Sequence, residues 1–181
     1  MEQTLPETDN HVINIESNRL LLRNILPKDK NFIIDLWTNS DVTEYMGGHR
    51  DRNKMNSDVQ ENIDNPFQDE YDLWILVDKA TGTSIGHCGL LKKDVEGIDE
   101  TEIIYVIDIK FWGKGYATEI AHMLINYAFK VKNLNSVIAL IKPQNKASEK
   151  VASNIGMKLE KEIIRQGNIP MLLYRKENDK T

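Results

Sequence analysis

Two glycines spaced one residue apart, Gly113 and Gly115, stand between an apolar β-branched run that ends near Ile107 and a long amphipathic segment that begins near Tyr116. A strand that leads through a glycine turn into a helix makes an anion site from main chain alone. The first helical N–H groups have no intrahelical partner, and the helix dipole adds partial positive charge there. Glycine also lacks the Cβ atom that would hold a phosphate away from those amides. The stretch 105–119 therefore predicts a phosphate-binding loop.

Two common phosphate motifs do not fit this loop. A P-loop needs serine or threonine after its lysine, but here Gly115 follows Lys114. A dinucleotide-binding fingerprint needs a third glycine where this chain has Thr118, and no βαβ opening precedes it. An enzyme of nucleotide phosphates would also need an acidic magnesium motif, which the sequence lacks.

Outside the loop, few residues have clear catalytic potential. Glu102 closes an acidic cluster that begins at Asp99, and its carboxylate could accept an amine proton or could simply be solvated. Cys88 follows His87 in an expected strand, where a thiol usually belongs to the core. Four scattered histidines and a single cysteine give no metal-ligand spacing, so we expect no metal.

The composition is that of one globular domain. With 181 residues, of which 40% are hydrophobic and 28% charged, the chain is long enough for a substantial core. We expect a cytoplasmic protein without membrane contact, because the sequence shows no bilayer-spanning run or signal peptide and has one cysteine. The formal charge of −5 argues against nucleic acid as a partner and is compatible with a cationic amine substrate.

The elements that must position these residues follow from hydrophobic periodicity. The strongest signal is the helix after the glycine loop, where apolar residues recur at helical spacing from Ala117 to Ala128. Other helices are predicted near 28–37, 54–63 and 145–155, with a polar loop at 47–53. Strands are predicted at 12–15, 19–25, 71–77, 84–91, 100–109, 136–141, 158–164 and 171–174. This order favours a mixed α/β sheet covered by helices.

Three motifs also occur along the chain in a recognisable order. They are Glu16-Ser-Asn-Arg-Leu-Leu-Leu-Arg23, then Phe111-Trp-Gly-Lys-Gly-Tyr-Ala-Thr-Glu119, and then Asn145-Lys-Ala-Ser148 followed by Asn154-Ile-Gly-Met157. Together they resemble the GCN5-related N-acetyltransferases (GNAT), in the branch with ribosomal-protein N-terminal and spermidine acetyltransferases. The pyrophosphate loop of that family reads Q/R-x-x-G-x-G/A, and this chain departs from it only by having Trp112 in the first position.

The resemblance implies a GNAT fold, an α/β (α+β) architecture. Its mixed, mostly antiparallel sheet would have about seven strands, helices on both faces and a splay between the fourth and fifth strands. The implied organisation is a single N-acetyltransferase domain at 16–176, an N-terminal extension at 1–15 and a polar tail at 177–181.

The resemblance also implies acetyl-CoA as co-substrate. Its pyrophosphate would lie on the loop amides, and its pantetheine arm would pair with the main chain of the fourth strand. Asn145 would contact the arm, although asparagine also suits a helix N-cap. The implied cofactor-binding residues are Tyr105, Val106, Ile107, Trp112, Gly113, Lys114, Gly115, Tyr116, Ala117, Thr118 and Asn145.

For catalysis the resemblance implies Glu102 as the base that accepts the amine proton. Several family members carry a tyrosine, seven residues after the asparagine, that protonates the leaving thiolate, but here that position is Ala152. Ser148 is the nearest polar substitute, and water could also serve. The predicted catalytic residues are therefore Glu102 and Ser148.

The implied activity is direct transfer of acetyl to a primary amine in a ternary complex, without a metal. Three acceptor classes stay open: a protein N-terminus, a polyamine or aminoglycoside-like amine, and a small amino-acid-like metabolite. We expect a monomer or homodimer. Because the family tyrosine is missing, a non-catalytic acyl-CoA-binding or regulatory module remains the alternative.

Overall fold

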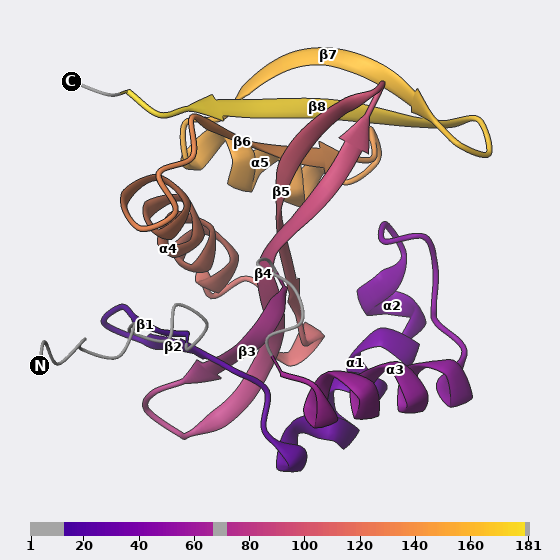
Figure 1. The fold of residues 1–181 in the computed structure, drawn as a ribbon, viewed down its shortest axis with the longest axis vertical. Coiled ribbons are helices and arrows are strands. Elements are labelled where there is room, and N and C mark those ends of the chain that lie inside the picture. Colours follow the sequence, from indigo (N-terminus) through magenta and orange to yellow (C-terminus); the bar gives the residue numbers. More distant parts are fainter. Residues whose placement is uncertain (1–12, 67–71, 180–181) are drawn as a thin grey trace, which may run out of the picture.

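The computed structural model describes residues 13–66 and 72–179, and in them eight strands form one sheet in the order β1-β2-β3-β4-β5-β6-β8-β7 (Figure 1). The strands are β1 (Asn14–Glu16), β2 (Leu20–Arg23), β3 (Leu73–Asp78), β4 (Thr83–Val95), β5 (Ile98–Ile107), β6 (Ser136–Ile141), β7 (Lys158–Arg165) and β8 (Ile169–Glu177). The α-helices are α1 (Lys30–Thr38), α2 (Ser40–Thr43), α3 (Arg52–Asp64), α4 (Tyr116–Lys130) and α5 (Lys146–Asn154), with short 3₁₀ turns at Pro27–Asp29 and Ile109–Phe111.

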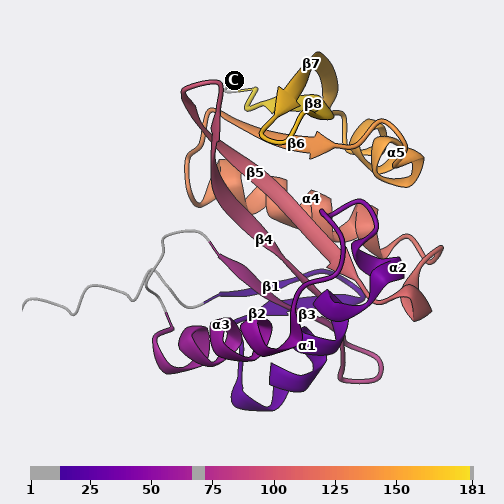
Figure 2. The same ribbon diagram turned by 90° about the vertical axis from the view of Figure 1, so that its right-hand side faces the viewer.

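Helices cover both faces of the sheet, as the sequence predicts. Alternation along β3 sends Trp74 and Leu76 into the core under α4, and sends Ile75 and Val77 into the core under α1 and α3. Figures 1 and 2 show α4 on one side of the central strands and the α1–α3 pair on the other. In the described part of the chain, no helix combines the length and apolar character needed to cross a membrane.

The sheet is split between β5 and β6. These strands run parallel, and within the described residues a single pair joins them, Glu102 opposite Ile138. Every other neighbouring pair of strands is antiparallel. The predicted splay is therefore present, immediately before the glycine loop. It separates the fifth and sixth strands rather than the fourth and fifth, because the short β1 raises the strand count from about seven to eight.

Some boundaries differ from the sequence-based expectation. Helix α3 begins at Arg52, inside the expected loop, because the Asp51 carboxylate accepts from the Lys54 N–H at 2.8 Å and caps the helix. Strand β1 takes in Asn14 and Ile15 of the expected N-terminal extension. Residues 1–12, the Tyr71 end of the expected third strand and the last two residues of the expected tail lie outside the described residues.

Helix α2 is an element that periodicity does not predict. The Asn39 side chain caps it by accepting from the N–H groups of Asp41 at 2.9 Å and Val42 at 3.3 Å. Four residues are too few to show a helical repeat, so only this cap marks the turn. The chain that follows α2 carries Tyr45 and Met46 to the split in the sheet.

A buried histidine links α1 to the sheet. Trp37 Nε1 donates to His87 Nδ1 at 3.0 Å, and His87 Nε2 lies 3.2 Å from the Leu73 carbonyl oxygen. Since Nδ1 accepts, Nε2 carries the proton and donates to Leu73. Burial lowers the pKa of His87 to about 4, so the ring is neutral at physiological pH.

Acidification is expected to destabilise the protein through His87. The unfolded state takes up a proton at the ordinary histidine pKa of 6.5 and the folded state only at about 4, so stability is lost as pH falls through this window. The loss is roughly 3 kcal/mol. Urea unfolding at a series of pH values measures it, and His87→Gln should remove most of this dependence. His122→Gln, on the exposed face of α4, is the control, and an unchanged pH dependence in His87→Gln would contradict the assignment.

Candidate active site

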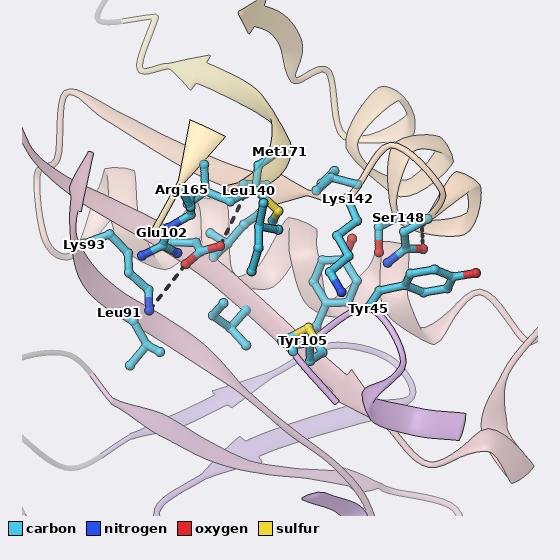
Figure 3. Close-up of a pocket in the computed structure, with 18 of the residues that line it drawn as sticks. Tyr45, Leu91, Lys93, Glu102, Tyr105, Leu140, Lys142, Ser148, Arg165 and Met171 are labelled. Carbon is cyan, nitrogen blue, oxygen red and sulfur yellow. Dashed lines mark hydrogen bonds and ion pairs between the residues drawn. The ribbon is translucent and has the colours of Figure 1, made fainter. Parts of the chain in front are cut away.

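A pocket of about 420 Å³ opens where β5 and β6 separate. Its wall is built from these two strands, from α1 and the chain after α2, from the start of α5, and from β4 and the β7–β8 hairpin (Figure 3). The polar side chains among its lining residues are Tyr45, Arg50, Lys93, Glu102, Tyr105, Lys142, Asn145, Ser148, Arg165 and Gln166.

Glu102 lies at the vertex of the split and is 5% exposed. One carboxylate oxygen accepts from the Leu140 N–H at 3.3 Å, and the other lies 3.8 Å from Lys93 Nζ (Figure 3). Burial raises the pKa of Glu102, against the opposing effects of Lys93, the Leu140 N–H and Arg165. A carboxylate of raised pKa is a better proton acceptor than an ordinary glutamate.

Tyr105 and Ser148 line the same pocket, where the Ser148 hydroxyl lies close to the Tyr105 phenol. Burial raises the pKa of the Tyr105 phenol more than the Ser148 hydroxyl lowers it, so the phenol keeps its proton at neutral pH. Sequence reasoning assigned only the main chain of Tyr105 to the site. Its side chain was missed because alternation along β5 places Tyr105 on the opposite face of the strand from Glu102, and only the splay of the sheet brings both side chains to one pocket.

Asn145 caps α5, since its side-chain oxygen accepts from the Ser148 N–H at 3.1 Å. It also lines the pocket, so the two interpretations that the sequence left open are compatible. Ala152, at the position of the family tyrosine, is buried in the core. Two phenols line the pocket, that of Tyr105 from β5 and that of Tyr45 from the chain after α2, and neither comes from α5.

The open edge of β5 carries main-chain groups toward the split. The Asp108 N–H donates to Ile85 on the β4 side, and by strand alternation Val106 also faces β4. The main-chain groups of Tyr105 and Ile107 consequently face the gap. Trp112 Nε1 donates to the Ile107 carbonyl at 2.7 Å, which closes the edge at its end. Of the three predicted β5 contacts, Val106 is thus placed away from the gap.

The glycine loop has the conformation that its sequence predicts. Gly113 and Gly115 have φ of 73° and 79°, in the left-handed region that favours glycine. Gly115 is the N-cap of α4, with no side-chain cap, so the first-turn N–H groups that begin at Tyr116 point into an uncapped helix end. Trp112, in the position where the family has Gln or Arg, anchors the loop through its indole N–H.

Arg19 fastens this loop to β2, a role that the sequence did not reveal. Its guanidinium donates to the Lys114 carbonyl at 3.0 Å and to the Glu119 carboxylate at 2.7 Å, and it lies 4.6 Å from the centre of the Tyr116 ring. The loop is therefore held in place by contacts that leave the helix N-terminus uncovered.

The predicted site residues fall in two places. The pocket is lined by Glu102, Tyr105, Asn145 and Ser148. The glycine loop, residues 112–118, follows the C-terminal end of β5 and does not line the pocket. Cys88 belongs to neither place. It is fully buried, and burial raises the pKa of its thiol to about 12, so it cannot serve as a thiolate nucleophile.

Comparison with known proteins agrees with this geometry. Residues 19–158 match the family described as Acetyltransferase (GNAT) domain. The chain is 34% identical over 163 residues to the uncharacterized protein YkkB of Bacillus subtilis, covering 90% of this chain and 94% of that protein.

Solved structures share the fold. An acetyltransferase (GNAT family) from Bacillus anthracis has a TM-score of 0.78 at 26% identity, over 93% of this chain and 100% of that one. Spermidine N-acetyltransferase from Vibrio cholerae, solved with CoA and spermine, has a TM-score of 0.74 at 18% identity, over 91% and 98%.

Proposed function

The chain belongs to the GNAT family of acetyltransferases, and from this premise we propose that it transfers acetyl from acetyl-CoA directly to a primary amine in the pocket between β5 and β6. The observation that carries the proposal is the pairing, in one pocket at the split, of a buried carboxylate of raised pKa, Glu102, with a hydroxyl pair, Tyr105 and Ser148. The amine class of the acceptor is part of the proposal.

Two features support acetyl-CoA as the acetyl donor. The uncapped N-terminus of α4, with glycine at both turning positions, fits a pyrophosphate. The edge of β5 at Tyr105, past the single pair that joins β5 to β6 at Glu102, fits an extended arm that adds to the sheet as a strand would. The thioester of acetyl-CoA supplies the carbonyl carbon that the amine attacks.

The residues of the pocket then have distinct tasks. Glu102 takes a proton from the amine as the N–C bond forms. Ser148 donates a proton to the sulfur as the C–S bond breaks, and Tyr105, whose phenol lies beside the Ser148 hydroxyl, replaces that proton. Asn145 holds the first turn of α5, and with it Ser148, at the pocket wall. No covalent intermediate with the protein is needed, consistent with the buried thiol of Cys88.

A non-catalytic acyl-CoA-binding module is the second candidate, because Ala152 occupies the position of the family tyrosine. The two candidates agree on the cofactor and differ on turnover. They are separated by measuring thiol release from acetyl-CoA over a panel of amines. Thiol release that depends on an added amine supports transfer, and binding of acetyl-CoA without thiol release supports the module.

Acetyl-CoA is expected to raise the melting temperature of the protein by several degrees at saturating concentration, because it binds only the folded state. ATP and NAD should cause little shift. S-acetylpantetheine, which lacks the pyrophosphate, should stabilise much less than acetyl-CoA if the loop carries the binding. Thermal-shift titrations measure all four ligands, and stabilisation by ATP but not by acetyl-CoA would overturn the proposal.

A further inference from the structure

The charge of the pocket is opposite to the charge of the chain. Four cationic side chains and one carboxylate line it, which gives a formal charge of +3, while the whole chain has a formal charge of −5. The cations are Arg50, Lys93, Lys142 and Arg165, and the carboxylate is Glu102. The negative net charge of the sequence suggested a cationic acceptor, whereas the local charge of the pocket favours an acceptor that carries an anionic group.

The cations of the pocket are only partly neutralised. Lys93 and Arg165 both act on Glu102, and one carboxylate cannot balance two cations. Within the described residues, the Arg165 side chain has no hydrogen bond or ion pair, although its main chain pairs with Ile169 on β8. In the same residues, Arg50 donates to the Met46 carbonyl and Lys142 to the Glu44 carbonyl, neither of which is charged.

The pyrophosphate of acetyl-CoA does not account for this charge. The loop proposed to hold the pyrophosphate lies beyond the end of β5, and residues 112–118 do not line the pocket. In Figure 3, Lys93 and Arg165 flank Glu102 at one end of the pocket, and Tyr105 and Ser148 lie toward the other. The cations nearest to Glu102 are therefore placed on the side away from the hydroxyl pair that would protonate the departing sulfur.

We infer that the acceptor is a small amine that also carries a carboxylate, with its amine at Glu102 and its carboxylate held by Arg165 and Lys93. This inference rests on the proposed function and selects the amino-acid-like class among the acceptors. The guanidinium of Arg165 offers two parallel N–H donors that match a carboxylate, and the ammonium of Lys93 adds a second positive charge. The carboxylate would restore neutrality around Lys93 and Arg165, whereas a polyamine would add positive charge to a pocket that already has an excess.

The experiment compares matched acceptors by thiol release from acetyl-CoA. Free amino acids are paired with their carboxamides, which keep size and amine but lose the negative charge, and spermidine represents polyamines. The best amino acid is expected to have a kcat/KM about tenfold to a hundredfold above its carboxamide, the range of a charged hydrogen-bonded contact. Arg165→Gln and Lys93→Gln should each lower the kcat/KM of the acid and reduce its advantage over the amide.

The control is Lys158→Gln, which removes one positive charge from an exposed position on β7, the strand that also carries Arg165, without touching the pocket. It should keep the acid preference. Equal rates for acid and amide, or better rates with spermidine, would overturn the inference while leaving acetyl transfer intact. If no amine of any class gave thiol release, that result would instead count against the proposed function.

Discussion

Glu102→Gln is expected to lower kcat about 10²–10³-fold, with little change in the KM for acetyl-CoA. The carboxamide keeps an oxygen that can accept from the Leu140 N–H, so the contact that joins β5 to β6 survives. It cannot take a proton from the amine. The substitution therefore separates the chemical role of Glu102 from its structural role at the split.

The pH dependence gives a second readout of the same residue. Burial raises the pKa of Glu102, so its protonation should produce an acid limb in the kcat profile above the ordinary carboxylate value of 4.5. The rate falls as pH drops, because protonated Glu102 cannot accept the amine proton. This limb should be missing in Glu102→Gln, leaving the limb due to the acceptor amine itself.

The stability of the variant is expected to be close to that of the parent at neutral pH. Because the folded-state pKa is raised, ionised Glu102 costs stability above that pKa, and the neutral glutamine does not. Glu100→Gln is the matched control, since Glu100 lies on the same face of β5 but pairs with Arg175 outside the pocket. Retention of more than about half of kcat in Glu102→Gln would exclude Glu102 as the base.

Where local sequence decides the structure, the sequence predicts it well. Strand β6 has the bounds that its apolar run predicts, and α4 follows the periodic residues from Ala117 to Ala128. The glycine loop is predictable for the same reason, because the left-handed φ of Gly113 and Gly115 is a local requirement of the chain. The match of residues 19–158 confirms the family that these motifs indicated.

The pocket was less predictable because it depends on long-range pairing. Lys93 comes from β4, Arg165 from β7 and Glu102 from β5, and they meet because the turn end of the β7–β8 hairpin reaches the split between β5 and β6. No local pattern marks a lysine or an arginine on such strands as a pocket residue. Net charge does not report the local charge of the pocket for a related reason, since it averages over charged groups of the whole chain.

The hydroxyl pair shows the same limit at the scale of one residue. The sequence points to Ser148 through its spacing from Asn145, and this local relation holds in the α5 cap. The phenol that Ser148 contacts arrives from β5, and neither residue predicts the other. The family tyrosine position is Ala152 in this chain and offers no phenol, and only the fold shows that Tyr105 lies beside Ser148.

Loss of this pair is expected to have the second large effect on turnover. Tyr105→Phe and Ser148→Ala should each lower kcat by about tenfold to a hundredfold, toward the lower part of the range for general acid catalysis, because water can partly replace the donor. The KM for acetyl-CoA should change little, since the proposed pairing of its arm with β5 uses main chain. Steady-state kinetics over both substrates separates these two quantities.

The double variant is the decisive measurement, because groups that act as one proton path are not additive. If Ser148 donates to the sulfur and Tyr105 replenishes it, Tyr105→Phe with Ser148→Ala should be no slower than the slower single variant. Tyr174→Phe is the control, because the Tyr174 hydroxyl donates to Glu149, which is on α5 like Ser148, and neither Tyr174 nor Glu149 lines the pocket. This variant should retain kcat within about twofold. Effects that multiply in the double variant would show that the two hydroxyls act separately, and unchanged kcat in both single variants would leave water as the proton donor.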